Sequence, residues 1–204
     1  MTNATLPQEL NNIISSEKKD FSLKSGRAQP LKKTFSIISV GTILLIIVSV
    51  SIKSFLYPIF QGGESHFKIN GIETTASFDN LGPAIFPGII IGIFLIISIV
   101  TIIQGIYSIF KKGGYFVGTP TRLIHYQKGK IKSIDWEQFT GNIEINNNAL
   151  SLEMRTGKFI NKKRGADKYI PDIIYISEIT NIFEIEKLCR KRIKENDPNP
   201  SQKI

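Results

Sequence analysis

The clearest pattern in this chain is the uneven distribution of its apolar residues. Residues 35–52 form a run of eighteen residues without a charge, and residues 83–110 form a second run of twenty-eight. About twenty apolar residues in a helix cross a bilayer, and neither run has the polar stripe of a helix on a soluble protein. Buried core elements of a soluble domain are the alternative, but strands are far shorter than eighteen residues. The pattern therefore predicts two transmembrane helices.

Short alternating segments replace the apolar runs after Gly114. Alternation of apolar and polar residues is typical of half-buried strands, and turn residues such as Pro120, Gly129 and Gly141 separate the segments. The phase slips between Ile131 and Ile134, which predicts a bulge or bend there. The expected strands cover 115–119, 122–127, 130–139, 142–146, 150–155 and, after a basic loop, 169–177. Together they predict a sheet of half-buried strands.

A helical pattern follows the last expected strand. Ser177 is placed to cap a helix that begins at Glu178, because serine side chains accept hydrogen bonds from the first free N–H groups. Apolar residues then recur at helical spacing and form one broad face. They are Ile179, Ile182, Phe183, Ile185, Cys189 and Ile193. We expect this C-terminal helix to pack on the sheet.

Charge gives the two spans an orientation. The chain has 26 Lys or Arg and 17 Asp or Glu, for a formal net charge of +9. Residues 1–34 carry six of the cations, Lys111 and Lys112 follow the second span, and the loop 57–82 carries only Lys68. Because Lys and Arg are enriched in cytoplasmic segments beside spans, we predict a multi-pass protein of the cytoplasmic (inner) membrane. Both termini would be cytoplasmic and the loop 57–82 would lie outside.

These patterns divide the chain into four parts. Residues 1–34 are expected to be a partly disordered cytoplasmic segment, and residues 35–110 a transmembrane hairpin. Lys111 and Lys112 mark the boundary, and Gly113-Gly114 ends the second helix. Residues 111–196 form the water-exposed domain, and residues 197–204 have the composition of a disordered tail.

The segment "GYFVGTPTRLIHYQKGKIKSIDWEQFTGNIEI" resembles the opening of the bacterial pleckstrin-homology-like (PH-like) domains found beside membrane spans. The similarity lies in a Tyr-x-Val-x-Thr start at Tyr115, an Arg-Leu-Ile strand from Arg122 and a hairpin centred on Gly129, and it covers about residues 113–195. Gly118, Pro120 and the basic insertion "NKKRGADK" depart from the usual pattern. The resemblance implies a curled antiparallel sheet capped by the C-terminal helix, and no particular ligand. The predicted fold class is therefore membrane α plus soluble α+β.

Candidate catalytic chemistry is sparse in this sequence. His66 and His125 are separated by a predicted span, so they cannot share a site. Cys189 is a single cysteine on an apolar helix face, where a thiol behaves as a small hydrophobe. No phosphate-binding glycine motif, Cys pair or Cys/His cluster occurs. We expect no enzyme activity, cofactor or metal; a site built from Asp135, Glu137 or His125 has only their polarity in its favour.

Basic residues are the candidate binding groups. Near the cytoplasmic leaflet each contributes about 1 kcal/mol of attraction to anionic lipid. The alternative is a set of solvated charges that only set the topology and keep the domain soluble. Nucleic acid is not expected, because no aromatic residues are interleaved with the cations. The candidate lipid- or partner-binding residues are Lys111, Lys112, Lys162, Lys163, Arg164, Arg190, Lys191 and Arg192.

A small-residue motif lies on the second span. Gly88 and Gly92 form a G-x-x-x-G, a spacing that lets two helices approach closely. This motif could pack the first span or another copy of the chain, which makes a homo-oligomer one possible assembly.

Two functions follow from these patterns. The first is a non-enzymatic membrane protein whose cytoplasmic PH-like domain binds protein or lipid as a scaffold or assembly subunit. The alternative is a self-assembling membrane effector, such as a pore-forming protein, or an immunity protein against one. Only the G-x-x-x-G motif and the small size of the chain favour this alternative. The few polar residues on the spans argue against a wide pore.

Overall fold

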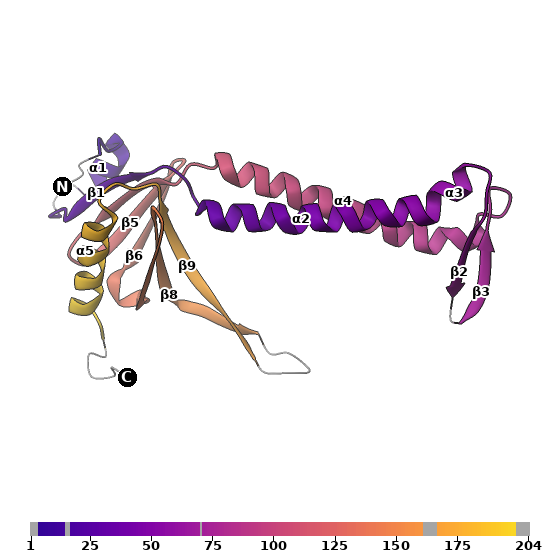
Figure 1. The fold of residues 1–204 in the computed structure, drawn as a ribbon. Helices are drawn as coiled ribbons and strands as arrows, with labels where there is room; N and C mark the ends of the chain where they lie inside the picture. Colours follow the sequence, from indigo (N-terminus) through magenta and orange to yellow (C-terminus); the bar gives the residue numbers. More distant parts are fainter. Residues whose placement is uncertain (1–3, 15–16, 70, 161–166, 199–204) are drawn as a thin grey trace. The chain divides into compact units, whose positions relative to one another are not determined.

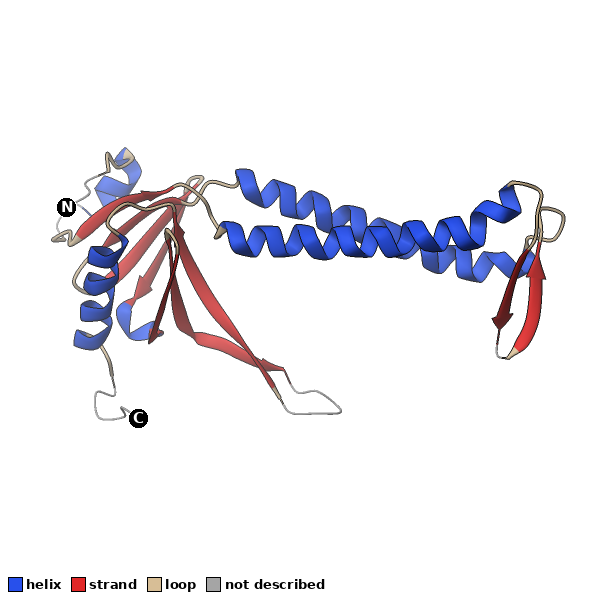
Figure 2. Cartoon of the chain, viewed as in Figure 1, coloured by secondary structure: helices blue, strands red, loops and turns tan. Residues whose placement is uncertain are grey.

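The computed structural model describes residues 4–14, 17–69, 71–160 and 167–198. The protein is a mixed α+β chain with two long apolar helices, several antiparallel sheets and a C-terminal helix (Figures 1 and 2). The chain divides into two compact units. Unit 1 contains Met1–Pro30 and Phe110–Ile204, and unit 2 contains Leu31–Ile109.

Unit 2 is built on the two long apolar helices. The first begins with α2 (Leu31–Ser51), continues through a π-helical turn (Ile52–Leu56) and ends with α3 (Tyr57–Phe60). The second is α4 (Gly82–Phe110). Both are long and apolar enough to cross a membrane, as the charge-free runs predict, and few of their side chains are buried. The first is longer than residues 35–52 because the helix continues past Lys53 to Phe60.

Helices α2 and α4 approach each other at glycines that the sequence analysis did not select. A Cβ atom on Gly41 would lie 2.8 Å from Cγ1 of Ile102, and one on Gly105 would lie 3.3 Å from the backbone N of Ile38. By contrast, no atom lies within 4 Å of a Cβ added at Gly88 or Gly92. The G-x-x-x-G motif therefore does not pack against the first span.

A small β-hairpin joins the two long helices. Strands β2 (Ser65–Ile69) and β3 (Ile72–Ala76) pair antiparallel. Ile59 and Ala76 form a small core with Ala84, and Phe67 packs edge-on against Phe55 with ring centroids 4.8 Å apart. The loop expected at 57–82 is thus partly folded.

Unit 1 contains a four-stranded antiparallel sheet in the order β1-β4-β5-β6. Its first strand comes from the N-terminal segment, in which no element was predicted. Phe21 lies opposite Gly118, and Ser25 lies opposite Gly114. A side chain at Gly118 would overlap the Phe21 ring, which accounts for the glycine at this position. The strands are β1 (Phe21–Ser25), β4 (Gly114–Gly118), β5 (Arg122–Gln127) and β6 (Lys130–Asp135).

A three-stranded antiparallel sheet in the order β7-β8-β9 follows. A 3-10 turn at Trp136–Gln138 separates it from β6, so the strand predicted over 130–139 ends at Asp135, and the next strand begins at Phe139. The bulge predicted between Ile131 and Ile134 is wrong, because β6 pairs with β5 in continuous register there. The apparent slip arises because Ile131 is exposed while Ile134 is buried. The strands are β7 (Phe139–Asn146), β8 (Ala149–Ile160) and β9 (Lys168–Ser177).

Helix α5 (Ile182–Glu195) packs against residues of both sheets in one hydrophobic core. Its buried residues Ile182, Ile185, Cys189 and Ile193 confirm most of the predicted apolar face. Phe183 was assigned wrongly to that face, since it is 72% exposed. The largest fully buried core side chains include Trp136, Phe116, Phe139, Leu123 and Ile134.

The predicted start of this helix is also wrong. Ser177 ends β9 instead of capping a helix at Glu178, and α5 begins after Asn181, whose φ of 59° is left-handed. Ser177 is unavailable as a cap because its backbone is bonded to β1. The Ser25 hydroxyl accepts a hydrogen bond from the Ser177 N–H at 2.9 Å, and the Gly26 N–H donates to the Ser177 carbonyl at 3.0 Å. These bonds join the four-stranded sheet to the three-stranded sheet.

The N-terminal segment, expected to be partly disordered, contributes folded elements to unit 1. Helix α1 (Gln8–Ile14) buries Leu10 and Ile14 against Val117 and Ile124. The Tyr126 hydroxyl donates to the Glu9 carboxylate at 2.9 Å. Residues 4–14 and 17–30 therefore form part of the domain that was predicted to begin at residue 111.

Two ion pairs hold the segment between α1 and β1. The Glu17 carboxylate pairs with Arg122, and the hydrogen bond from this guanidinium lowers the pKa of Glu17. Asp20 receives two hydrogen bonds from Arg192 of α5, at 2.6 and 2.7 Å. Only 8% of the Asp20 side chain and 19% of the Arg192 side chain are exposed. Removal of Asp20 takes two hydrogen bonds from a largely buried guanidinium and leaves it only the partly exposed Glu195 as an acidic partner.

We expect Asp20→Ala to destabilise unit 1 by about 3 kcal/mol, the scale for breaking a largely buried ion pair. The native Cys189 is a convenient reporter, because it is fully buried and burial raises the pKa of its thiol. The rate of Cys189 labelling by a maleimide under native conditions should rise about 100-fold. Lys191→Ala is the control, since its pair with Glu195 is exposed and 3.8 Å long, and it should change the rate less than threefold. Equal rates for Asp20→Ala and Lys191→Ala would contradict this role of Asp20.

The helix contact in unit 2 gives a second prediction. Gly41→Leu should lower the thermal unfolding midpoint of the detergent-solubilised protein, followed by circular dichroism, because overpacking costs about 1–3 kcal/mol. Gly92→Leu adds the same side chain where a Cβ meets open space, so it should leave the midpoint unchanged. A larger loss for Gly92→Leu than for Gly41→Leu would show that the motif glycine, and not Gly41, lies at the helix contact.

Candidate functional site

The described residues contain no group of three or more His, Cys, Asp or Glu side chains that could hold a metal ion. His125 stacks on Phe116 with ring centroids 4.1 Å apart, and its Nε2 lies 2.8 Å from the Gly113 carbonyl oxygen. Burial lowers the pKa of His125, and burial raises the pKa of the Cys189 thiol. The buried thiol of Cys189 is held in its protonated form and is not arranged as a nucleophile, and the ring of His125 is held in place by Phe116 and the Gly113 carbonyl.

The basic residues predicted on the last helix all have acidic partners. Arg190 bonds to Glu186 one turn away, at 2.6 Å for the closest pair of atoms, and Lys191 lies 3.8 Å from Glu195. Arg192 is largely buried between Asp20 and Glu195. This group therefore stabilises the helix and its contact with the N-terminal segment, and Arg192 is not available to a ligand.

Lys111 and Lys112 lie in the link between α4 and β4. Both are exposed, and their backbones join neighbouring segments of unit 1. The Ala28 N–H donates to the Lys111 carbonyl at 2.9 Å, and the Gln127 side-chain amide donates to the Lys112 carbonyl at 2.5 Å. The remaining predicted cations, Lys162, Lys163 and Arg164, lie outside the described residues.

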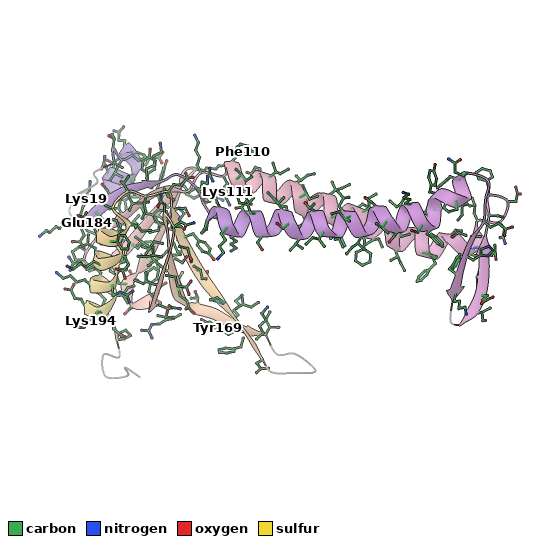
Figure 3. All side chains as sticks on the ribbon, viewed as in Figure 1. Lys19, Phe110, Lys111, Tyr169, Glu184 and Lys194 are labelled. Atoms are coloured by element: carbon green, nitrogen blue, oxygen red, sulfur yellow. The ribbon has the colours of Figure 1, made fainter. Side chains whose placement is uncertain are left out.

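An extended ribbon formed by the ends of β8 and β9 brings four exposed large apolar side chains of unit 1 together. Strand β7 pairs with β8 only as far as Met154, whereas β8 and β9 remain paired to Ile160 and Lys168. Figure 1 shows this pair continuing beyond the other strands of unit 1, and Figure 3 labels Tyr169 on it. A register shift lies between Met154 and Lys158 and marks the base of the ribbon.

The ribbon carries apolar side chains on both of its faces. Residues opposite each other in register share a face, and successive residues alternate between faces. Phe159 lies opposite Tyr169 with ring centroids 4.9 Å apart, so one face is aromatic. On the other face Lys158 lies opposite Ile170, and Ile160 lies opposite Lys168. Phe159 is 70%, Ile160 50%, Ile170 44% and Tyr169 37% exposed.

Polar contacts fasten the base of the ribbon. The Thr156 hydroxyl donates to the Asp172 carboxylate at 2.8 Å, and a hydrogen bond to Glu153 raises the pKa of the Tyr169 hydroxyl. An open hollow of about 300 Å³ lies on the face with the isoleucines, between Lys158 and Pro171. Pro171 suits the position because β9 is an edge strand, where a missing N–H breaks no bond within the sheet.

The sequence analysis located the basic loop but missed this ribbon. It ended the fifth strand at Arg155, because Thr156 and Gly157 interrupt the apolar alternation. In the structure β8 continues to Ile160 past the register shift. The pair Phe159-Ile160, directly before a basic loop and facing Tyr169-Ile170 after it, is the signal that predicts a longer hairpin.

A second hollow, of about 380 Å³, lies on the β2–β3 hairpin of unit 2. His66 and Thr75 approach to 3.0 Å there, and Lys68 pairs with Glu73 at 3.2 Å. These side chains are largely exposed and satisfy one another, so they form no enclosed binding site.

Comparisons with known proteins add no further constraint on this site. No family model, curated protein or solved structure matches the chain. The geometry of the described residues is therefore the basis for assigning a function.

Proposed function

We propose that this chain is a two-span protein of the cytoplasmic membrane that holds a PH-like domain at the inner surface. In this proposal the domain is a non-enzymatic scaffold or assembly subunit that binds protein or lipid. Unit 1 is the proposed domain, and helices α2 and α4 are the proposed spans.

The observation that carries the proposal is the pairing of β1 with β4. These strands are neighbours in one sheet, yet the whole of unit 2 lies between them in the sequence. A sheet cannot form across a bilayer, so the segments before α2 and after α4 must be on the same side. Two spans satisfy this requirement, because a chain that crosses twice returns to the side from which it started.

The distribution of charge supports the cytoplasmic side for unit 1. Lys and Arg are concentrated in residues 1–34 and after residue 110, whereas Lys68 is the one cation in the loop 57–82. Such an excess marks cytoplasmic segments. In this proposal the strand pairing supports a shared side for both ends of the chain, and the charge bias supports the cytoplasmic side.

The order of elements in unit 1 supports a PH-like fold. Antiparallel sheets of four and three strands share one core, and a C-terminal helix packs on that core. The resemblance of residues 113–195 implies the same arrangement of a curled sheet and a capping helix. In this proposal the first strand of the domain precedes the spans, so the transmembrane hairpin is an insertion between its first two strands.

A binding role is favoured because unit 1 exposes an apolar ribbon. Phe159 and Ile160 are large apolar side chains at the end of an extended strand pair, where they contribute nothing to the core. Exposed apolar groups that gather at one place mark sites of interaction. A scaffold or assembly subunit uses such a surface without any catalytic group.

Cysteine accessibility in intact cells that express the full chain tests this proposal. Glu73→Cys places a thiol on the exposed β2–β3 hairpin, while Lys19→Cys and Lys187→Cys place one on each sequence segment of unit 1. We expect a membrane-impermeant maleimide to label position 73 directly, and positions 19 and 187 only after permeabilisation. The unmodified chain is the control, because its Cys189 is buried.

Two outcomes would overturn the proposal. If positions 19 and 187 lay on opposite sides, the two-span topology and the strand pairing would both be wrong. If both were labelled from outside, the domain would face away from the cytoplasm.

A further inference from the structure

The tip of the β8–β9 ribbon carries exposed apolar side chains next to lysines. None of these side chains belongs to the buried core of unit 1. We propose that the tip formed by residues 158–160 and 168–170 is a membrane-contact site that binds the surface of anionic phospholipid. This inference rests on the proposed function, because it requires unit 1 to be held beside a membrane.

The apolar groups on both faces argue for a medium that surrounds the tip. Phe159 and Tyr169 occupy one face, and Ile160 and Ile170 occupy the other. A flat protein surface would cover one face and leave the other in water. The headgroup and upper acyl region of a bilayer covers both, and aromatic side chains are favoured at that depth.

The cations favour anionic over neutral lipid. Lys158 and Lys168 lie on opposite strands, each next to an apolar residue, so their stems can lie along the apolar tip while the ammonium groups reach phosphate. Asp167 is the carboxylate beside Lys168. Each cation near an anionic surface strengthens attraction by a factor of about five.

The edge of the ribbon is poorly suited to pairing with a second copy. Pro171 removes a backbone donor from β9, and Lys158 and Lys168 place a charge on each strand. Proline and lysine on exposed strands oppose edge-to-edge association. The lipid surface is therefore the occupant that both the apolar and the charged groups fit.

Because the links between unit 1 and the long helices are short, a weak contact between the tip and lipid is enough to keep the tip at the membrane. Residues 26–30 and 111–113 join unit 1 to α2 and α4, and three extended residues span at most about 11 Å. If these helices lie in a bilayer, unit 1 cannot diffuse away from it. A tethered site acts at high effective concentration, so the tip needs little intrinsic affinity for lipid.

The test uses the full chain in lipid nanodiscs with an environment-sensitive fluorophore on Ile160→Cys. Cys189 is buried and remains unlabelled. We expect a blue-shifted emission, quenched by spin-labelled lipid, in discs of phosphatidylcholine and phosphatidylglycerol. In discs of phosphatidylcholine alone, the ratio of lipid-contacting to aqueous label should be at least tenfold lower. A label on Lys187→Cys of α5 should remain aqueous in both.

Charge-reversal variants distinguish lipid binding by the lysines of the tip from a general attraction of the basic chain to an anionic membrane. Lys158→Glu with Lys168→Glu should lower the lipid-contacting ratio at position 160 at least tenfold. Lys130→Glu with Lys132→Glu makes the same change in net charge on the exposed lysines of β6 and should alter it less than twofold. Equal effects of the two pairs, equal contact in neutral discs, or protection of position 160 only by a second copy of the chain would each overturn the proposal.

The sidedness of positions 19 and 187 is measured independently and identifies which claim has failed. Correct sidedness with an aqueous label at position 160 rejects the lipid contact and leaves the membrane scaffold intact. Wrong sidedness rejects the proposed function itself.

Discussion

Antiparallel pairing between β1 and β4 is the interaction on which the rest of unit 1 depends. It brings together residues 21–25 and 114–118, which are separated in the sequence by the whole of unit 2. Phe21 and Leu23 of β1 belong to the same core as Phe116 of β4, so the core is incomplete until both segments have been made. A contact this distant in sequence carries a large loop-closure cost in a disordered chain. A preformed pair of helices between the strands lowers that cost, since it brings their ends together before the sheet forms.

Polar contacts join β1 and the residues before it to the other sheet and to α5. Ser25 joins the end of β1 to Ser177 of β9, and Asp20, just before β1, is held by Arg192 of α5. The N-terminal segment therefore touches the other sheet and the C-terminal helix through hydrogen bonds that are mostly shielded from water. Such bonds are costly to leave unmade, so they fix where β1 lies along the domain. The same shielding explains why Arg192 is a structural residue although its sequence context is a basic cluster.

Sequence patterns identified the elements whose signals are local. The two apolar helices follow from runs without charge, and β5, most of α5 and its buried face follow from periodicity. Strand β1 was missed because "FSLKS" is short and lies among charged residues, and its burial depends on β4 and α5. The start of α5 was misplaced because a capping serine and a serine used in sheet closure look alike in sequence.

At the candidate site, the basic loop was visible in the sequence, but the apolar ribbon depends on a register shift that no local pattern shows. Gly41 and Gly105 were missed because close helix approach depends on the partner, while a G-x-x-x-G spacing does not reveal its partner.

Cross-linking of β1 to β4 in native membranes measures whether the domain closes around the two-helix insertion. Lys24 lies opposite Tyr115, with its ammonium 5.7 Å from the ring centroid, so cysteines at these two positions should lie within reach of a short bifunctional thiol reagent. A control pair at Lys24 and Lys132 is separated by three strand spacings, about 14 Å. We expect intramolecular cross-linking of the 24–115 pair and none of the 24–132 pair. Failure of the 24–115 pair, with each single cysteine accessible, or cross-linking only between separate chains would show that the domain does not close around the two-helix insertion.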